Sequence, residues 1–140
     1  MSLSYPKFVT KVPGPKAKKV LAIDDACVSP SYTRTYPLVA KTGRGAMIED
    51  VDGNQFLDCT AGIAVNSTGH CHPKIVAALQ KQAAELIHMS GTDFYYPQQA
   101  ELAQRLTEIS PGFKGGKVFL TNSGTESVEA AIKLHPLVKD

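Results

Sequence analysis

The sequence contains no tryptophan and only three cysteines in 140 residues. An odd number of cysteines without an apolar leader segment does not suit a secreted disulfide-rich domain, and it indicates free thiols in a reducing compartment. No run approaches the ~18 consecutive apolar residues of a membrane-spanning helix. We therefore expect a cytoplasmic protein without a membrane partner.

An excess of charge of one sign is also missing, because the net charge is only +2 at neutral pH. The one dense basic stretch, residues 16–19, is short and typical of a solvated face, so we expect no nucleic-acid partner. His70 and His72 flank Cys71, but in an extended chain their side chains would point to opposite sides. No other cysteine or histidine completes a recognised zinc spacing, so we predict no metal site.

Hydrophobic residues make up 43% and charged residues 20% of the chain, proportions that suit a globular protein. Proline- and glycine-rich breaks divide the chain into four segments. We expect an N-terminal arm and loop, a small antiparallel β region with a buried loop, a two-helix segment, and a final strand followed by a helix. These segments cover residues 1–35, 36–72, 73–116 and 117–140.

The β region contains a hairpin signal. Residues 47–51 and 55–59 flank an Asp-Gly-Asn turn at residues 52–54, where aspartate and glycine tolerate the positive φ of a tight turn. Residues 36–40 are a further candidate strand. The following stretch, residues 60–72, is too apolar for a simple exposed loop, which indicates burial against a partner or a ligand.

Apolar residues recur at helical spacing in the third segment. A helix over residues 73–88 begins at Pro73, since proline is favoured at the first helical position. A second helix begins at Pro97 and ends before Pro111. Nearer the N-terminus, a short helix can begin after Pro15.

The last segment is the most informative. An apolar run at residues 117–121 predicts a strand, and helix formers continue to Leu134. Ser123 and Glu126 have the spacing of a capping box, which marks the helix start. The first backbone N–H groups of such a helix, its dipole and the neighbouring hydroxyls suit a phosphate, and Gly124 allows close approach. Many helices that begin in this way bind nothing, and the pattern matches neither a Walker loop nor a dinucleotide fingerprint.

Residues 122–134 resemble the phosphate-binding segment of the class III aminotransferases, pyridoxal-phosphate enzymes of fold type I. Residues 52–65 and 69–73 resemble a second stretch of the same family, in the same order and at about the same separation. The resemblance implies the N-terminal segment of an α/β fold type I transferase. It comprises an arm, a small antiparallel sheet, helices and the first strand–helix unit of the large cofactor-binding domain, truncated at residue 140.

The resemblance also implies the site and its ligands. Ser123, Gly124 and Thr125 would bind the phosphate of pyridoxal 5′-phosphate, whereas Glu126 would cap the helix. In 4-aminobutyrate aminotransferases the position matching Ile63 borders the substrate, although a packed interface residue is an equal alternative. Small-molecule partners would be an amino donor and a 2-oxo acid, and the complete enzyme would be a homodimer.

The resemblance leaves the reaction open among three possibilities. The first is transfer of an amino group from an ω-amino donor to 2-oxoglutarate, with residues 13–16 and 52–58 favouring a 4-aminobutyrate-like donor. The second is an acetylornithine or ornithine aminotransferase, or a pyridoxal-phosphate-dependent amino-acid racemase. The third is a non-catalytic dimerisation fragment.

Several groups that the family needs are not recognisable. Lys114, Lys117, Lys133 and Lys139 lack the context of a Schiff-base lysine, and the carboxylate that pairs with the pyridinium nitrogen lies downstream in the family. We therefore predict no catalytic residue in these 140 residues and an inactive, marginally folded or aggregation-prone fragment. The end, residues 135–140, departs from the family, and its proline predicts that the helix stops near Leu134.

Overall fold

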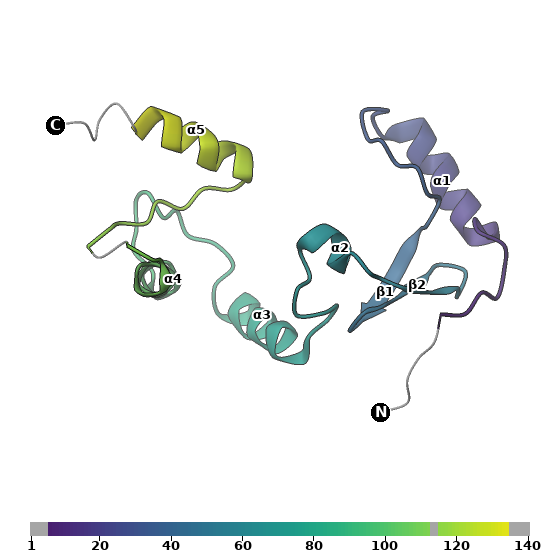
Figure 1. Cartoon of the computed structure of the whole chain (residues 1–140), viewed down its shortest axis with the longest axis horizontal. Helices are drawn as coiled ribbons and strands as arrows, with labels where there is room; N and C mark the ends of the chain where they lie inside the picture. Colours follow the sequence, from purple (N-terminus) through teal and green to yellow (C-terminus); the bar gives the residue numbers. More distant parts are fainter. Residues whose placement is uncertain (1–5, 113–114, 135–140) are drawn as a thin grey trace. The chain divides into compact units, whose positions relative to one another are not determined.

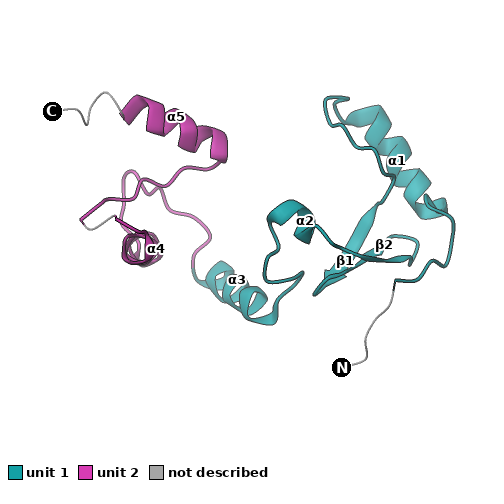
Figure 2. Ribbon diagram, viewed as in Figure 1, with its two compact units in different colours: residues 1–85 teal, residues 86–140 magenta. Residues whose placement is uncertain are grey.

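The computed structural model describes residues 6–112 and 115–134 (Figure 1). The chain divides into two compact units, residues 1–85 and 86–140 (Figure 2). The first unit contains α1 (Pro15–Cys27), β1 (Ala40–Arg44), β2 (Met47–Asp50), β3 (Gln55–Leu57), α2 (Ala61–Ala64) and α3 (Pro73–Glu85). The second contains α4 (Pro97–Ile109) and α5 (Gly124–Leu134). None of the described helices is long and apolar enough to cross a membrane.

The strands form an antiparallel sheet in the order β1-β2-β3. The predicted hairpin is confirmed, because β2 and β3 pair across the turn with Ile48 opposite Phe56. The prediction of a strand at residues 36–40 is wrong, since β1 begins only at Ala40. Pro37 has no N–H group to donate to a strand ladder, which explains why pairing starts after it.

A buried polar cluster at the hairpin turn fastens the N-terminal arm to the sheet. Asp50 is 1% exposed and Asn54 is 0% exposed. The side-chain oxygen of Asn54 accepts hydrogen bonds from the N–H groups of Val9 (2.8 Å) and Thr10 (2.9 Å), and its amide nitrogen donates to Asp50 (2.7 Å). Burial acts to raise the pKa of Asp50, but hydrogen bonds from the Asn54 side chain and nearby N–H groups bring it below its usual value.

The same turn also positions α1. The carboxylate of Asp52 accepts hydrogen bonds from the N–H groups of Lys16 (2.9 Å) and Ala17 (2.8 Å), which belong to the first turn of that helix. Gly14 precedes the helix and has no side chain to cap it. Because Asp52 takes over that role from 35 residues along the chain, the hairpin fixes the start of α1.

The helices lie where the sequence pattern predicts them, but one predicted strand does not form. The helix predicted over 73–88 ends earlier, at Glu85, while the prediction of a helix from Pro97 that ends before Pro111 is confirmed. Residues 117–121 do not form the predicted strand, because no described segment pairs with them and a strand requires a partner ladder. α5 extends to Leu134, the last residue that the structure describes, and residues 135–140 lie outside the described residues, so the predicted helix end near Leu134 stays a prediction.

Much apolar surface remains open in the part of the chain that the structure describes. Ala17 is the only buried hydrophobic residue there, whereas Phe119 is 71% exposed and Ile132 is 64% exposed. Exposed apolar area on this scale usually marks surface that another protein segment covers. The expectation of a marginally stable, aggregation-prone chain stays a prediction.

Gly69 lies at a close approach between the last part of the first unit and the sheet. It has φ +85°, and a Cβ atom there would lie 3.1 Å from the Cα atom of Gly45. We expect Gly69→Ala to lower the free energy of unfolding by about 2–4 kcal/mol, because positive φ and crowding both oppose a methyl group. Urea unfolding followed by circular dichroism measures this.

Gly45→Ala is the matched control for this substitution. Gly45 also has positive φ (+59°), but a Cβ atom there would meet nothing within 4 Å. We expect it to cost only about 1 kcal/mol, the price of the backbone conformation alone. Equal losses in the two variants would contradict the crowding at Gly69.

Candidate functional site

The start of α5 is a capping box, as the sequence predicts. The Ser123 hydroxyl accepts a hydrogen bond from the N–H group of Glu126 (3.2 Å). The Glu126 carboxylate accepts one from the N–H group of Asn122 (2.6 Å), one residue earlier than in the usual motif. Glu126 therefore caps the helix, and its own charge is engaged with the backbone.

The predicted phosphate-binding residues lie together at this helix start. Ser123, Gly124 and Thr125 are all exposed. The N–H groups of Gly124 and Thr125 have no acceptor in the described part of the chain, as expected for the first turn of an α-helix. The helix dipole adds roughly half a positive charge at this end. The turn is thus open and has unused donors, so it fits a phosphate group.

No feature of the described part of the chain requires a glycine at position 124, which is consistent with a phosphate that binds there. A Cβ atom at Gly124 would meet nothing within 4 Å, and its φ lies outside the left-handed region. Neither crowding nor backbone conformation within the described residues therefore calls for glycine. A requirement for glycine at this position would come from a group that approaches the backbone from outside.

A hollow of about 550 Å³ lies beside this turn, along the run 119–122 and the inner face of α5. Its walls include Phe119, Leu120 and Leu134, together with Glu126 and the ion pair of Glu129 with Lys133. The only basic group is paired and acidic groups outnumber it, so these largely apolar walls do not suit an anion. The hollow therefore suits packing by another protein segment, and only the helix start offers groups that suit a phosphate.

Ile63, the other predicted site residue, lies in a left-handed turn of the first unit. Residues Ala61 to Ala64, which form α2, have φ values of 51°, 61°, 60° and 62°. Left-handed backbone costs about 1–2 kcal/mol for each non-glycine residue, so this turn stores roughly 3–6 kcal/mol. The Ile63 side chain is 86% exposed, so the predicted burial against a partner or ligand stays a prediction.

Asp58 is the centre of the contacts that hold this turn. One carboxylate oxygen accepts hydrogen bonds from the N–H group (2.9 Å) and the hydroxyl (2.8 Å) of Thr60. The other accepts from the N–H group of Gly62 (2.8 Å) and from Nε2 of His70 (2.7 Å). The hydrogen bond from His70, followed by those from Thr60, holds the pKa of Asp58 well below its usual value.

His70 is itself fixed in place by the turn between β1 and β2. Its backbone exchanges two hydrogen bonds with Gly45, of 3.0 and 2.8 Å. The side-chain nitrogen of Asn66 lies 3.3 Å from Nδ1 of His70 and can only donate there, so Nε2 carries the proton that Asp58 accepts. Asp58 and His70 side chains are 11% and 17% exposed, so the pair is largely shielded from water.

Sequence reasoning missed this pair. It considered His70 as a metal ligand and as part of the stretch that resembles the family, and it placed Asp58 near the end of the strand predicted over residues 55–59. The local signal was the Asp-x-Thr spacing of residues 58–60, since aspartate and threonine side chains form hydrogen-bonded turns with residues just ahead. The partnership with His70 crosses a gap of 12 residues and has no such signal.

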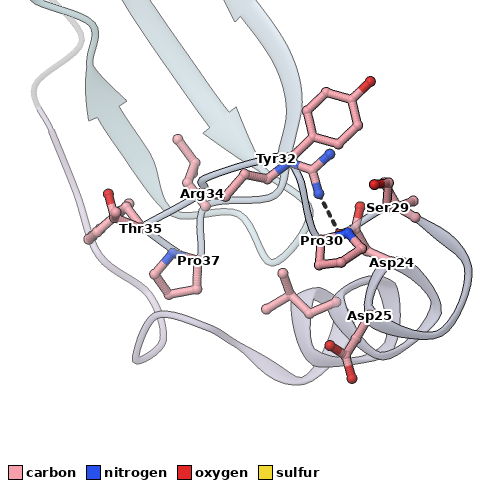
Figure 3. A pocket seen from close by; sticks show the side chains of 12 residues that line it. Asp24, Asp25, Ser29, Pro30, Tyr32, Arg34, Thr35 and Pro37 are labelled. Atoms are coloured by element: carbon pink, nitrogen blue, oxygen red, sulfur yellow. Dashed lines mark hydrogen bonds and ion pairs between the residues drawn. The ribbon is translucent and has the colours of Figure 1, made fainter.

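A second cavity, of about 660 Å³, lies between the end of α1 and residues 28–38 (Figure 3). Arg34 forms an ion pair with Asp24 there, and its guanidinium lies 4.8 Å from the ring centroid of Tyr32. None of the site residues predicted from the sequence lines this cavity.

Comparisons with known proteins agree with the resemblance. Residues 28–137 match the family model described as Aminotransferase class-III. Acetylornithine aminotransferase of Methanosarcina acetivorans is 47% identical over 122 residues, which cover 87% of this chain and 30% of that enzyme. Alanine/serine racemase of Pyrococcus horikoshii is 42% identical over 134 residues, which cover 94% of this chain and 28% of the racemase.

A solved structure shows the same likeness. Acetylornithine aminotransferase from Elizabethkingia anophelis aligns with a TM-score of 0.76 and 32% identity, over 84% of this chain and 30% of that one. The chain therefore spans about 30% of the length of the relatives it matches. Its mixed α/β fold with a small antiparallel sheet matches their amino-terminal part, which confirms the predicted fold class.

Proposed function

Because this chain belongs to the class III aminotransferase family, we propose that it is the amino-terminal part of an enzyme that moves an amino group from an ω-amino donor to a 2-oxo acid. Members of this family use pyridoxal 5′-phosphate, whose ring withdraws electrons from the substrate carbon that carries the amino group. The complete enzyme is proposed to act as a homodimer.

In this proposal Ser123, Gly124 and Thr125 bind the phosphate of the cofactor. The observation that carries the assignment is the pair of unpaired N–H groups at Gly124 and Thr125, exposed at the positive end of α5. The hydroxyls of Ser123 and Thr125 add further donors. Glu126 stays outside the anion site because its carboxylate binds the N–H group of Asn122.

The relatives bear on the choice of amino donor. Two of those described above are acetylornithine aminotransferases, which favours an acetylornithine- or ornithine-like donor over the 4-aminobutyrate-like donor preferred from the sequence. Ile63 is proposed to contact the carbon chain of that donor, since its apolar side chain is held outward by the strained turn.

A second candidate is an amino-acid racemase that uses the same cofactor. The observation in its favour is the 42% identity to the alanine/serine racemase of Pyrococcus horikoshii over 94% of this chain. A racemase and an aminotransferase would share the phosphate site, so the two differ in whether a 2-oxo acid accepts the amino group. Assay of the complete enzyme with and without 2-oxoglutarate separates them.

Gly124→Ala tests the phosphate site directly. We expect affinity for pyridoxal 5′-phosphate to fall about tenfold, because a methyl group stands where the phosphate must approach the backbone, and a tenfold loss corresponds to about 1.4 kcal/mol. Affinity for pyridoxal, which lacks the phosphate, should not change. Calorimetric titration of both compounds measures the difference.

Gly112→Ala is the control for affinity, since a Cβ atom there also meets nothing within 4 Å, although its φ of +70° costs alanine about 1–2 kcal/mol of stability that Gly124→Ala does not lose. It should leave both affinities unchanged. The helix content of Gly124→Ala should be equal to or greater than that of the parent, because alanine favours helix over glycine. An equal loss of affinity for pyridoxal and its phosphate would refute the assignment of the phosphate to this turn.

A further inference from the structure

The conformational preferences of residues 61–64 do not explain why they form a left-handed turn. Of its residues only Gly62 adopts positive φ readily, while Ala61, Ile63 and Ala64 are forced into it. Strained backbone of this kind persists only where the surroundings over-determine it, and it gathers at functional sites. The contacts that over-determine it converge on one side chain, that of Asp58.

Asp58 binds the turn at its entrance and inside it. Thr60 precedes the turn and donates two hydrogen bonds to the carboxylate, and Gly62 donates another from within the turn. The Thr60 hydroxyl in turn accepts from the N–H group of Ile63 (3.3 Å). His70 also donates a hydrogen bond to the carboxylate, and its own backbone is hydrogen-bonded to Gly45 in the turn between β1 and β2.

We propose that Asp58, supported by His70, is a positioning residue that holds residues 61–64 in the left-handed turn and so presents Ile63 as a preformed apolar contact for the carbon chain of the amino donor. The last part of this statement rests on the proposed function. The first part concerns the conformation of this chain and is testable without any activity.

Asp58→Asn changes this arrangement with almost no change in shape. The asparagine amide has one acceptor oxygen where the carboxylate has two, so it cannot accept from the N–H groups of Thr60 and Gly62 at the same time. Loss of the negative charge also weakens the hydrogen bonds that remain, including the one from Nε2 of His70. The variant therefore weakens the contacts that hold the turn whichever way the amide is oriented.

The conformational test uses NMR on the isotopically labelled complete enzyme, with the 140-residue chain measured alongside. The parent should show the strong intraresidue HN–Hα cross-peaks of positive φ at Ala61, Ile63 and Ala64, together with slow amide exchange at Gly62. In Asp58→Asn we expect at least about tenfold faster exchange at Gly62 and loss of the Ile63 signature. Asn54, in the hairpin, should keep its exchange rate.

Asp93→Asn is the matched control, because Asp93 also accepts hydrogen bonds from nearby hydroxyls in a loop but belongs to the other compact unit. It should leave the turn unchanged. Thr60→Val provides a second route should Asp58→Asn fail to fold, because it removes the hydroxyl that links Asp58 to Ile63. Retention of positive φ at Ile63 in both variants would overturn the proposal.

The functional arm is a double-mutant cycle in the complete enzyme. Ile63→Ala and Asp58→Asn should each raise KM for the amino donor about five- to tenfold, with smaller changes in kcat. Because Asp58 acts through Ile63, the double variant should be no worse than Ile63→Ala alone. If the two increases in KM multiply in the double variant, Asp58 has a general structural role and its link to Ile63 is refuted. Absence of transaminase activity in the parent would refute the proposed function and leave the NMR result standing.

Discussion

Asn54→Ala is expected to lower the free energy of unfolding of the unit that contains residues 1–85 by about 3 kcal/mol or more. The substitution leaves the N–H groups of Val9 and Thr10 without their acceptor and removes a hydrogen bond from the buried carboxylate of Asp50. Each buried group left unsatisfied costs about 1–3 kcal/mol. Urea unfolding followed by far-UV circular dichroism measures the loss.

The pH dependence of stability separates this mechanism from a simple loss of packing. Asp50 has a lowered pKa in the folded chain, so it stabilises the fold above its unfolded pKa of about 3.9, and this contribution is lost as pH falls through the folded value. Asn54→Ala removes a cause of that lowering, so its stability should fall less steeply below about pH 4. An unchanged slope would contradict the role assigned to Asn54.

Asn122→Ala is a suitable control because Asn122 is exposed and its side chain makes no hydrogen bond in the described structure. It should change stability by no more than about 0.5 kcal/mol. A loss equal to that of Asn54→Ala would show that the polar cluster at the hairpin turn is not what fastens the arm.

The features that the sequence predicted correctly are those that depend on neighbouring residues. The hairpin follows from the Asp-Gly-Asn turn at residues 52–54, and the start of α5 follows from Ser123 and Glu126, which are three residues apart. In each case the residues that determine the structure also contact one another, so spacing alone is informative.

The features that the sequence did not reveal depend on distant partners. Residues 117–121 have a strand composition, but no described segment pairs with them. Asn54 was recognised only as a turn residue, although its main partners, Val9 and Thr10, lie about 45 residues away. The left-handed turn is imposed by Asp58 and His70, and no propensity of Ala61 or Ile63 favours it.

Reduction of the 140-residue chain with borohydride in the presence of pyridoxal 5′-phosphate is expected to leave no lysine stoichiometrically labelled, and the chain alone should show no transaminase turnover. Among the described candidates, Lys133 forms an ion pair with Glu129 (3.3 Å) and is 76% exposed. It lies about 14 Å along α5 from Gly124, at 1.5 Å per residue. Lys117 is exposed in the run before Ser123, and neither lysine has a shielded environment that would activate it.

Peptide mapping by mass spectrometry measures this labelling, with the complete enzyme as the positive control. Lys114 and Lys139 lie outside the described residues, and mapping tests them on equal terms. Weak labelling spread over many lysines is the expected background, since exposed amines react with an aldehyde without selectivity. Full labelling of a single lysine, together with turnover, would show that these 140 residues hold a catalytic amine beside the phosphate site. We propose that this segment binds the phosphate and positions the donor, while other residues of the complete enzyme carry out the covalent chemistry. Full labelling with turnover would refute that proposal.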